Sequence, residues 1–352
     1  MHVPDGFLDA PTSVATGAVA AAAVAVSLRK ARGETDERTA PLAGLTAAFV
    51  FAVQMLNFPV GVGTSGHLMG GALAAVLVGP WTAVLVLSVV LAVQALLFAD
   101  GGLSALGTNI VLIGVVTVAV GWAGTRLVLA LLPRRPASVV PAAFVGALLS
   151  VPAAAVVFVG LYAVGGAADL PLGPLTATMV GWHGVIGLGE AVITALTVSA
   201  VVAVRPDLVF AARGLRPALE LRGADGCVQV PAQAPVGPGA TTHARRTSGR
   251  LVAAGLAATL LLAGVASFFA SGSPDGLEHV AEEQGFIDTA RDHDFGHLPL
   301  ADYGDVGGIP VGLAGLLGVT VTVLVGWLVF RLVAGRRPDR STAPADDAHE
   351  RV

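Results

Sequence analysis

The first two residues, Met1 and His2, carry donor atoms suited to a metal chelate. The free α-amine of Met1, the backbone nitrogen of His2 and Nδ1 of its ring can close two fused chelate rings around one ion, with three nitrogens in a plane. An ionised backbone nitrogen suits square-planar or tetragonal ions, so this set favours Ni²⁺ or Cu²⁺ and also accommodates Co²⁺. The turn Pro4-Asp5-Gly6 would stiffen the short segment that holds Met1 and His2 in place. An N-terminal Met-His pair is common, so by itself it is a weak signal.

A fourth nitrogen would complete the square, and His67 is the best candidate for it. His67 lies at the outer end of an apolar segment, between Gly63 and Gly71, and the glycines around it allow close backbone packing. Taken alone, His67 is more simply explained as a structural, hydrogen-bonded histidine.

Further polar residues interrupt the apolar segments. His183 and Glu190 are seven residues apart, about two helical turns, so they share one helix face. Gln94, Asp100 and Asn109 surround a Gly-rich stretch. Ionisable groups at membrane depth are costly and usually face the bundle interior. Two explanations remain equally open: support that orients the metal ligands, or interhelical hydrogen bonds that hold the bundle together.

The elements that position these residues must be membrane helices. The chain has 352 residues, of which 55% are hydrophobic and 12% charged, whereas soluble domains have about 25% charged residues. Mean hydropathy is +0.79. The mild net charge of −4 gives no reason to expect nucleic-acid binding. The single cysteine, Cys227, excludes an internal disulfide and a thiolate-rich metal site.

Apolar runs predict an all-α, polytopic membrane protein, because a spanning helix needs about 20 apolar residues. We expect a seven-helix bundle in residues 1–213, a flexible cytoplasmic linker in 214–249, a two-helix domain with an external loop in 250–335 and a cytoplasmic tail in 336–352. The predicted spans are 12–28, 41–56, 67–79, 81–99, 104–132, 139–164, 182–204, 250–270 and 309–332.

Basic residues collect on the cytoplasmic side of membrane proteins. With the N-terminus outside and the C-terminus cytoplasmic, every Lys and Arg except Arg291 falls on the inner side. We therefore expect a multi-pass protein of the plasma membrane with this orientation. No signal peptide is evident, so the mature chain is expected to begin at Met1. The outer side then holds most of the histidines and many acids, a composition that attracts divalent cations, although each acid alone is explained as a solvated loop residue.

Four ordered motifs resemble the CbiM/NikM family, the substrate-capture components of nickel and cobalt energy-coupling-factor transporters. They are residues 1–8 (MHVPDGFL), 66–71 (GHLMGG), 94–109 (QALLFADGG followed by ALGTN) and 183–190 (HGVIGLGE). The resemblance implies that Met1, His2 and His67 bind the metal. It also implies seven helices, with the N-terminus folded into the pocket. We expect Asp5 and the polar residues above, Gln94, Asp100, Asn109, His183 and Glu190, to support these ligands.

The tail resembles the small companion subunit of these systems, a PDGLE domain, through SPDGLE (273–278) and AEEQGF (281–286). Here it is fused through the linker, and we assign no ligand role to its loop, which is expected to help metal entry or to order the N-terminus. The implied partners are a transmembrane coupling protein and cytoplasmic ATPases. The implied cargo is Ni²⁺ or Co²⁺, with no permanently bound cofactor.

Two alternatives compete with an ATP-driven importer. A stand-alone secondary transporter would need a proton relay at mid-membrane, for which Glu190 is thin support. A membrane metalloenzyme would need an open metal position, which four in-plane nitrogens would fill, so we expect no enzyme. The chain has no Walker A or hydrolase motif, so any ATPase must be another chain. Nickel and cobalt are not distinguished at this stage.

Overall fold

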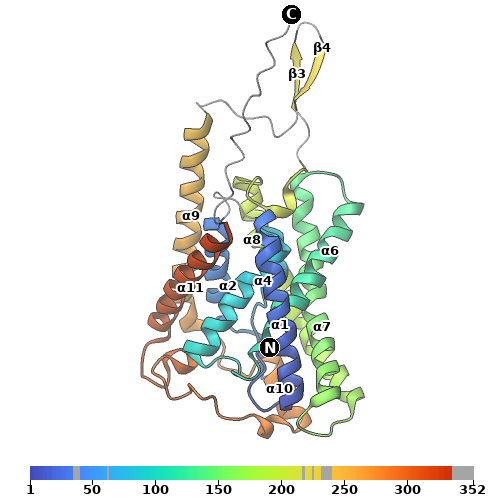
Figure 1. Cartoon of the computed structure of the whole chain (residues 1–352), viewed down its shortest axis with the longest axis vertical. Coiled ribbons are helices and arrows are strands. Elements are labelled where there is room, and N and C mark those ends of the chain that lie inside the picture. The colour runs from blue at the N-terminus through green and yellow to red at the C-terminus, as the bar shows by residue number, and fades with distance from the viewer. Residues whose placement is uncertain (35–39, 62, 216–218, 224–225, 231–239, 335–352) are drawn as a thin grey trace, which may run out of the picture.

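The computed structural model describes residues 1–34, 40–61, 63–215, 219–223, 226–230 and 240–334. These residues form a helical bundle (Figure 1), which confirms the all-α membrane fold expected from the sequence. Strands in the described residues are confined to two antiparallel hairpins, β1 (Phe58–Gly61) with β2 (Thr64–Gly66) and β3 (Leu219–Gly223) with β4 (Gly226–Val230). The β3–β4 hairpin projects from the end of the bundle opposite to α10.

Each predicted span contains at least one helix, and α10 is a further helix between the last two predicted spans. The helices are α1 (Ala10–Lys30), α2 (Ala40–Gln54), α3 (Gly71–Val78), α4 (Pro80–Val93), α5 (Leu106–Asn109), α6 (Thr117–Leu131), α7 (Val139–Gly165), α8 (Leu172–Val204), α9 (Ala240–Gly264), α10 (Gly276–Gln284) and α11 (Val311–Ala334). Two π-helical segments, η2 (Gln94–Phe98) and η3 (Ile110–Val116), extend α4 and join α5 to α6.

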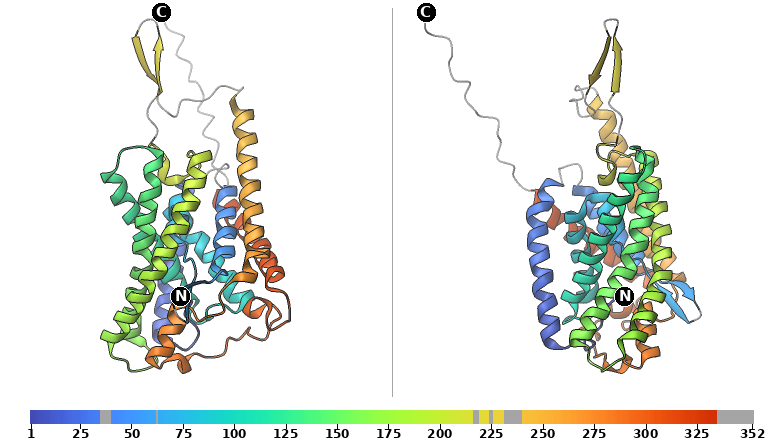
Figure 2. Two further views of the ribbon diagram at one scale, coloured as in Figure 1. Left: turned by 180° about the vertical axis from the view of Figure 1, so that it is seen from behind. Right: turned by 90° about the vertical axis from the view of Figure 1, so that its right-hand side faces the viewer.

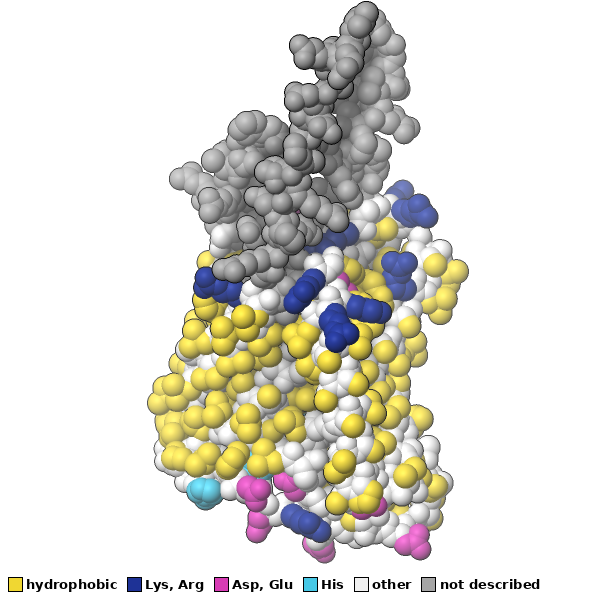
Figure 3. Space-filling model, viewed as in Figure 1, with side chains coloured by type: hydrophobic (Ala, Val, Ile, Leu, Met, Phe, Trp, Pro, Cys, Tyr) yellow, Lys and Arg dark blue, Asp and Glu magenta, His cyan; other side chains and the backbone are white. Residues whose placement is uncertain are grey.

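By length and composition, six described helical stretches can cross a membrane: 10–33, 80–98, 106–131, 136–165, 172–204 and 311–332. Two further apolar helices are shorter, Pro41–Gln54 and Val252–Gly264. The exposed side chains of these long and short apolar helices include many Val and Leu residues. The space-filling view shows a broad hydrophobic surface between the two ends of the molecule (Figure 3). Lipid can solvate such a surface, whereas water would not.

Three helix starts differ clearly from the predicted spans. One is α9, which begins at Ala240, ten residues before the predicted start and inside the segment expected to be a flexible linker. The span predicted from residue 67 becomes helical only at Gly71, because Gly70 has φ +82° and residues 67–70 have no regular secondary structure. The span predicted from residue 182 begins at Leu172, directly after Pro171. Pro174 is tolerated there because a first-turn residue has no intrahelical bond to donate. The late start of α3 leaves non-helical backbone directly after His67.

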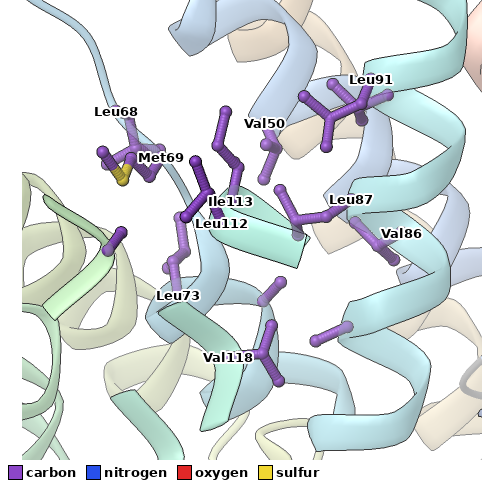
Figure 4. Close-up of a cluster of buried hydrophobic side chains, with 14 of the residues drawn as sticks. Val50, Leu68, Met69, Leu73, Val86, Leu87, Leu91, Leu112, Ile113 and Val118 are labelled. Atoms are coloured by element: carbon purple, nitrogen blue, oxygen red, sulfur yellow. The ribbon is translucent and has the colours of Figure 1, made fainter. Parts of the chain in front are cut away.

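Small residues bring the helices close to one another. A side chain at Gly71 would collide with Thr117, and one at Gly121 would meet Ala72 at 2.5 Å. Beneath the segment that carries His67, a tightly packed apolar core joins α2, α3, α4 and η3 (Figure 4). Its fully buried members include Val50, Leu68, Leu73, Leu87, Leu112 and Ile113. This core fixes the floor on which the site is built.

Candidate metal site

The N-terminal segment enters the bundle instead of projecting from it (Figure 2). Met1 is 3% exposed, and Val3 and Phe7 are fully buried. The α-amine of Met1 contacts Nε2 of His67, and Nδ1 of the same ring lies 3.1 Å from the Leu68 carbonyl oxygen. The structure therefore brings together two groups that the sequence suggested as metal ligands.

Side-chain and backbone hydrogen bonds hold this N-terminal strap, residues 1–8, in place. Oδ1 of Asn109 accepts from the Val3 amide at 2.7 Å, and its Nδ2 donates to the Val3 carbonyl at 3.0 Å. The Asp5 carboxylate accepts from the amides of Leu103 at 3.0 Å and Ser104 at 2.7 Å. Asn109 and Asp5, both expected to support the ligands, thus contact the strap or hold it to the chain beside it.

The His2 ring lies flat against the His67 ring, with centroids 4.8 Å apart and planes inclined by 10°. Its Nδ1 is 3.1 Å from Oδ1 of Asp100, and its Nε2 is buried without a hydrogen-bond partner in the described part of the chain. The expected chelate uses this Nδ1, so forming it requires the ring to turn away from Asp100. The ring geometry seen here is therefore not yet that of the three-nitrogen plane.

Asp100 is held from a second side by Tyr303, which the sequence analysis did not single out. The Tyr303 hydroxyl donates to Oδ2 of Asp100 at 2.5 Å and accepts from Nε2 of Gln94 at 3.3 Å. Burial would raise the pKa of Asp100, but the His2 and Tyr303 contacts hold it well below its usual range. Asp100 therefore remains an anion beside the His2 ring.

Tyr303 reaches this position from a strained turn. Asp302 and Tyr303 have φ of +49° and +51°, in the left-handed region that non-glycine residues seldom occupy. The Tyr303 ring stacks on Phe98, with centroids 5.1 Å apart. Packing and hydrogen bonding at the ring can offset a backbone cost of about 1–3 kcal/mol per residue.

The second residue that the sequence analysis missed is Asp275, from the PDGLE motif. Its Oδ2 lies 2.7 Å from the Met1 amine and 3.6 Å from Nε2 of His67. Burial would raise the pKa of Asp275, but the Met1 ammonium and His67 hold it well below its usual range. Burial, followed by the ammonium charge, lowers the pKa of His67, which favours a neutral ring. Neutral imidazole is the form that binds metals.

Glu190 and His183, predicted on one face of a helix, both support neighbouring segments. The Glu190 carboxylate accepts from the amides of Met69 at 2.7 Å and Gly70 at 3.0 Å, so it caps the start of α3 just after His67. His183 Nδ1 lies 2.8 Å from the Met179 carbonyl oxygen, within α8. Its Nε2 is buried without a hydrogen-bond partner among the described residues, and its ring lies against Gly276.

Side chains alone do not make a metal centre here. No group of three or more His, Cys, Asp or Glu residues could hold an ion within the described ranges. The converging donors are instead the Met1 amine, His67 and Asp275, with the His2 backbone nitrogen adjacent to the amine. The donors that converge here thus include nitrogen from the N-terminus as well as side chains.

Comparison with known proteins identifies the family of each part of the chain. Residues 2–208 match the family model described as "Cobalt uptake substrate-specific transmembrane region" (CbiM), and residues 249–335 match the PDGLE domain model. A putative metal transport protein of Haloquadratum walsbyi is 38% identical over 60% of this chain and 94% of its own length. The putative fused nickel transport protein NikMN of Archaeoglobus fulgidus is 38% identical over 59% of this chain and 68% of its own length.

A crystal structure described as a transition metal transporter is 32% identical, with a TM-score of 0.50 over 57% of this chain and 92% of that chain. The protein family consists of metal transporters and not of enzymes. The chain therefore belongs to the CbiM family of cobalt uptake substrate-specific transmembrane regions, here fused to a PDGLE domain.

Proposed function

We propose that this protein captures Ni²⁺ or Co²⁺ at the outer face of the plasma membrane, as the substrate-specific component of an ATP-driven energy-coupling-factor importer. One observation carries the proposal: the α-amine of Met1 is buried against Nε2 of His67. Burying a charged amine costs free energy. A functional gain can offset this cost, because the amine becomes a nitrogen ligand once it loses its proton to a bound ion. In this proposal the amine, the His2 backbone and ring nitrogens and His67 Nε2 bind the ion.

The proposed orientation has the N-terminus outside and the C-terminus in the cytoplasm. Figure 3 shows Asp, Glu and His side chains gathered at one end of the visible face and most Lys and Arg near the other. The positive-inside rule places the basic end in the cytoplasm, so the site faces outward. Residues 1–213, 214–249, 250–335 and 336–352 would then be the capture domain, linker, PDGLE domain and tail; much of the linker and all of 336–352 lie outside the described residues.

The cargo and the partners follow from chemistry. Nitrogen donors suit Ni²⁺ and Co²⁺, and Cu²⁺ would bind more tightly still, so availability must help to select the ion. The chain has no nucleotide-binding motif, so uptake driven by ATP requires a transmembrane coupling protein and cytoplasmic ATPases. The relatives' names include both nickel and cobalt transport proteins, which fits either cargo.

Metal analysis of the purified full chain, after loading with competing Ni²⁺, Co²⁺ and Cu²⁺, tests this function. His2→Ala, His67→Ala and a one-residue N-terminal extension, verified by mass spectrometry, should each abolish tight binding while the protein still inserts. His297→Ala, at an exposed loop histidine, is the matched control and should bind normally. Tight binding by the extended variant would refute the chelate. Uptake that persists without ATPase partners but stops when the proton gradient collapses would refute the importer.

A further inference from the structure

The PDGLE domain places a carboxylate directly at the candidate metal site. Asp275 lies at the start of α10, in the C-terminal part of the chain, yet its Oδ2 is 2.7 Å from the Met1 amine and 3.6 Å from His67 Nε2. Ligands bound at about 2.0–2.2 Å to one ion lie about 3 Å apart when adjacent and about 4 Å apart when opposite. The oxygen is therefore close enough to both nitrogens for all three atoms to share one ion after a small rearrangement.

We propose that Asp275 is a metal ligand, so that the captured ion is bound by both ends of the fused chain. The proposal rests on the proposed function, because it assumes that the Met1 amine and His67 bind the ion. When the ion binds, the Met1 ammonium and the His2 backbone amide each release one proton to solvent. The ion pair between the amine and Asp275 is then exchanged for one bond from each group to the metal.

The two oxygens of Asp275 have separate partners. Oδ1 accepts from the amides of Leu277 at 2.7 Å and Glu278 at 3.0 Å, which caps α10. Oδ2 is directed to the amine and His67. Helix capping therefore fixes the orientation of the carboxylate and leaves one oxygen for the ion.

Backbone pairing fixes where this carboxylate lies relative to His67. The Ser65 amide donates to the Pro274 carbonyl at 2.9 Å, and the Ser65 hydroxyl donates to the Ser273 carbonyl at 2.8 Å. Ser65 precedes His67 by two residues, and Pro274 directly precedes Asp275. A Cβ at Gly276 would lie 2.6 Å from Cδ1 of Ile186, so glycine lets α10 approach α8 without displacing the end of that side chain.

Charge balance also favours the carboxylate as a ligand. A divalent ion bound by one ionised backbone nitrogen keeps one net positive charge, and a buried net charge is costly unless it is paired. One carboxylate ligand brings the complex to neutrality. The Asp275 side chain is 11% exposed, so solvent supplies little compensation in its place.

Metal-induced infrared difference spectra of the full chain in detergent, with Ni²⁺ alone as probe, test the proposal. A carboxylate that binds a metal shifts its symmetric and antisymmetric stretching bands. Asp275→Asn keeps an oxygen that caps α10, since Asn is as good an N-cap as Asp, but turns an amide nitrogen toward the ion. We expect it to lose those bands and to weaken binding by about 100-fold or more, beyond the 10–100-fold typical of groups that only support a ligand.

Glu278→Gln is the matched control, because Glu278 completes the same capping box by accepting from the Asp275 amide at 3.0 Å. It should keep the bands and the affinity. Asp275→Ser, a cap too short to reach the ion, replaces the Asn variant if that fails to fold. Unchanged bands and affinity in the Asp275 variant, with binding that still requires His67, would refute the ligand but leave the proposed function intact. Absence of tight binding by the unmodified chain would instead refute the proposed function.

Discussion

Replacing Asn109 with Ala tests whether the N-terminal strap is held in advance for metal binding. Asn109 does not contact the Met1 amine or His67; its side chain exchanges two hydrogen bonds with the backbone of Val3, at 2.7 and 3.0 Å. Both residues are buried. The substitution therefore removes the support of the strap and leaves every proposed metal ligand in the chain.

The size of the effect follows from these two bonds. Each contributes about 0.5–1.5 kcal/mol net, or about 2 kcal/mol together. The Val3 carbonyl keeps a bond from the Gly102 amide at 2.9 Å, but the Val3 amide loses its acceptor. A strap that is detached in the metal-free protein must be ordered again on binding, which reduces the apparent affinity by the competent fraction. A cost of about 2 kcal/mol corresponds to about 30-fold weaker binding.

The assay is chelator competition for Ni²⁺ with the purified full chain, accompanied by thermal unfolding. Thr108→Ala is the control, since Thr108 is equally buried and bonds Thr16 at 2.8 Å on α1 instead of the strap. Its affinity should stay within about twofold of the parent, because the strap is untouched. Equal affinities for the Asn109 variant and the parent, or equal losses in both variants, would show that the strap needs no anchoring.

Three further outcomes are expected. Tyr303→Phe keeps the stacked ring but removes the hydroxyl, so Ni²⁺ affinity measured by chelator competition should fall by about 10-fold, as for other groups that orient ligands; unchanged affinity would mean that the hydroxyl orients nothing. Gly71→Ala drives a methyl group into Thr117 and should reduce the free energy of unfolding by about 1–3 kcal/mol, measured as a lower thermal unfolding temperature. Gly160→Ala, whose methyl group meets open space, should leave that temperature unchanged. The pKa of His67 is lowered from 6.5 in the folded protein, so below about pH 6.5 the unfolded chain binds a proton that the folded chain does not. The stability of the metal-free protein should therefore fall as pH drops below about 6.5, by at most about 1.4 kcal/mol per pH unit. In His67→Gln the unfolding temperature should depend less on pH over this range, and an unchanged pH dependence would refute the assignment.

The helices were predictable from the sequence because their signal is local. Long apolar runs located the spans, and the all-α membrane fold is confirmed. The start of α8 was harder to predict. Pro171, Gly173 and Pro174 are typical of a loop, although the first turn of a helix also accepts them. The late start of α3 depends on the left-handed conformation of Gly70 and on its capping by Glu190, which is distant in sequence.

The candidate site was only partly predictable, because part of it depends on contacts between segments that are distant in sequence. Met1 and His67 are distinctive residues, and the structure brings them together. Asp275 is one of many acids outside the apolar spans, and local sequence does not separate it from the rest. Its position depends on Ser65 pairing with Pro274, a contact between distant segments. The orientation of the His2 ring toward Asp100 likewise depends on which groups surround it.

The fused C-terminal domain has a structural reason to accompany the bundle. The amide of Arg291 donates to the Asp5 carbonyl at 2.7 Å, so the strap is held by the loop between α10 and α11 as well as by the bundle. The charge that neutralises the Met1 ammonium comes from Asp275, and the phenol that holds Asp100 comes from Tyr303. A bundle without this domain would keep its nitrogen donors but would lose the groups that orient and neutralise them. Fusion keeps the domain at a high local concentration beside the strap, so the proposed metal site would be assembled before the metal arrives.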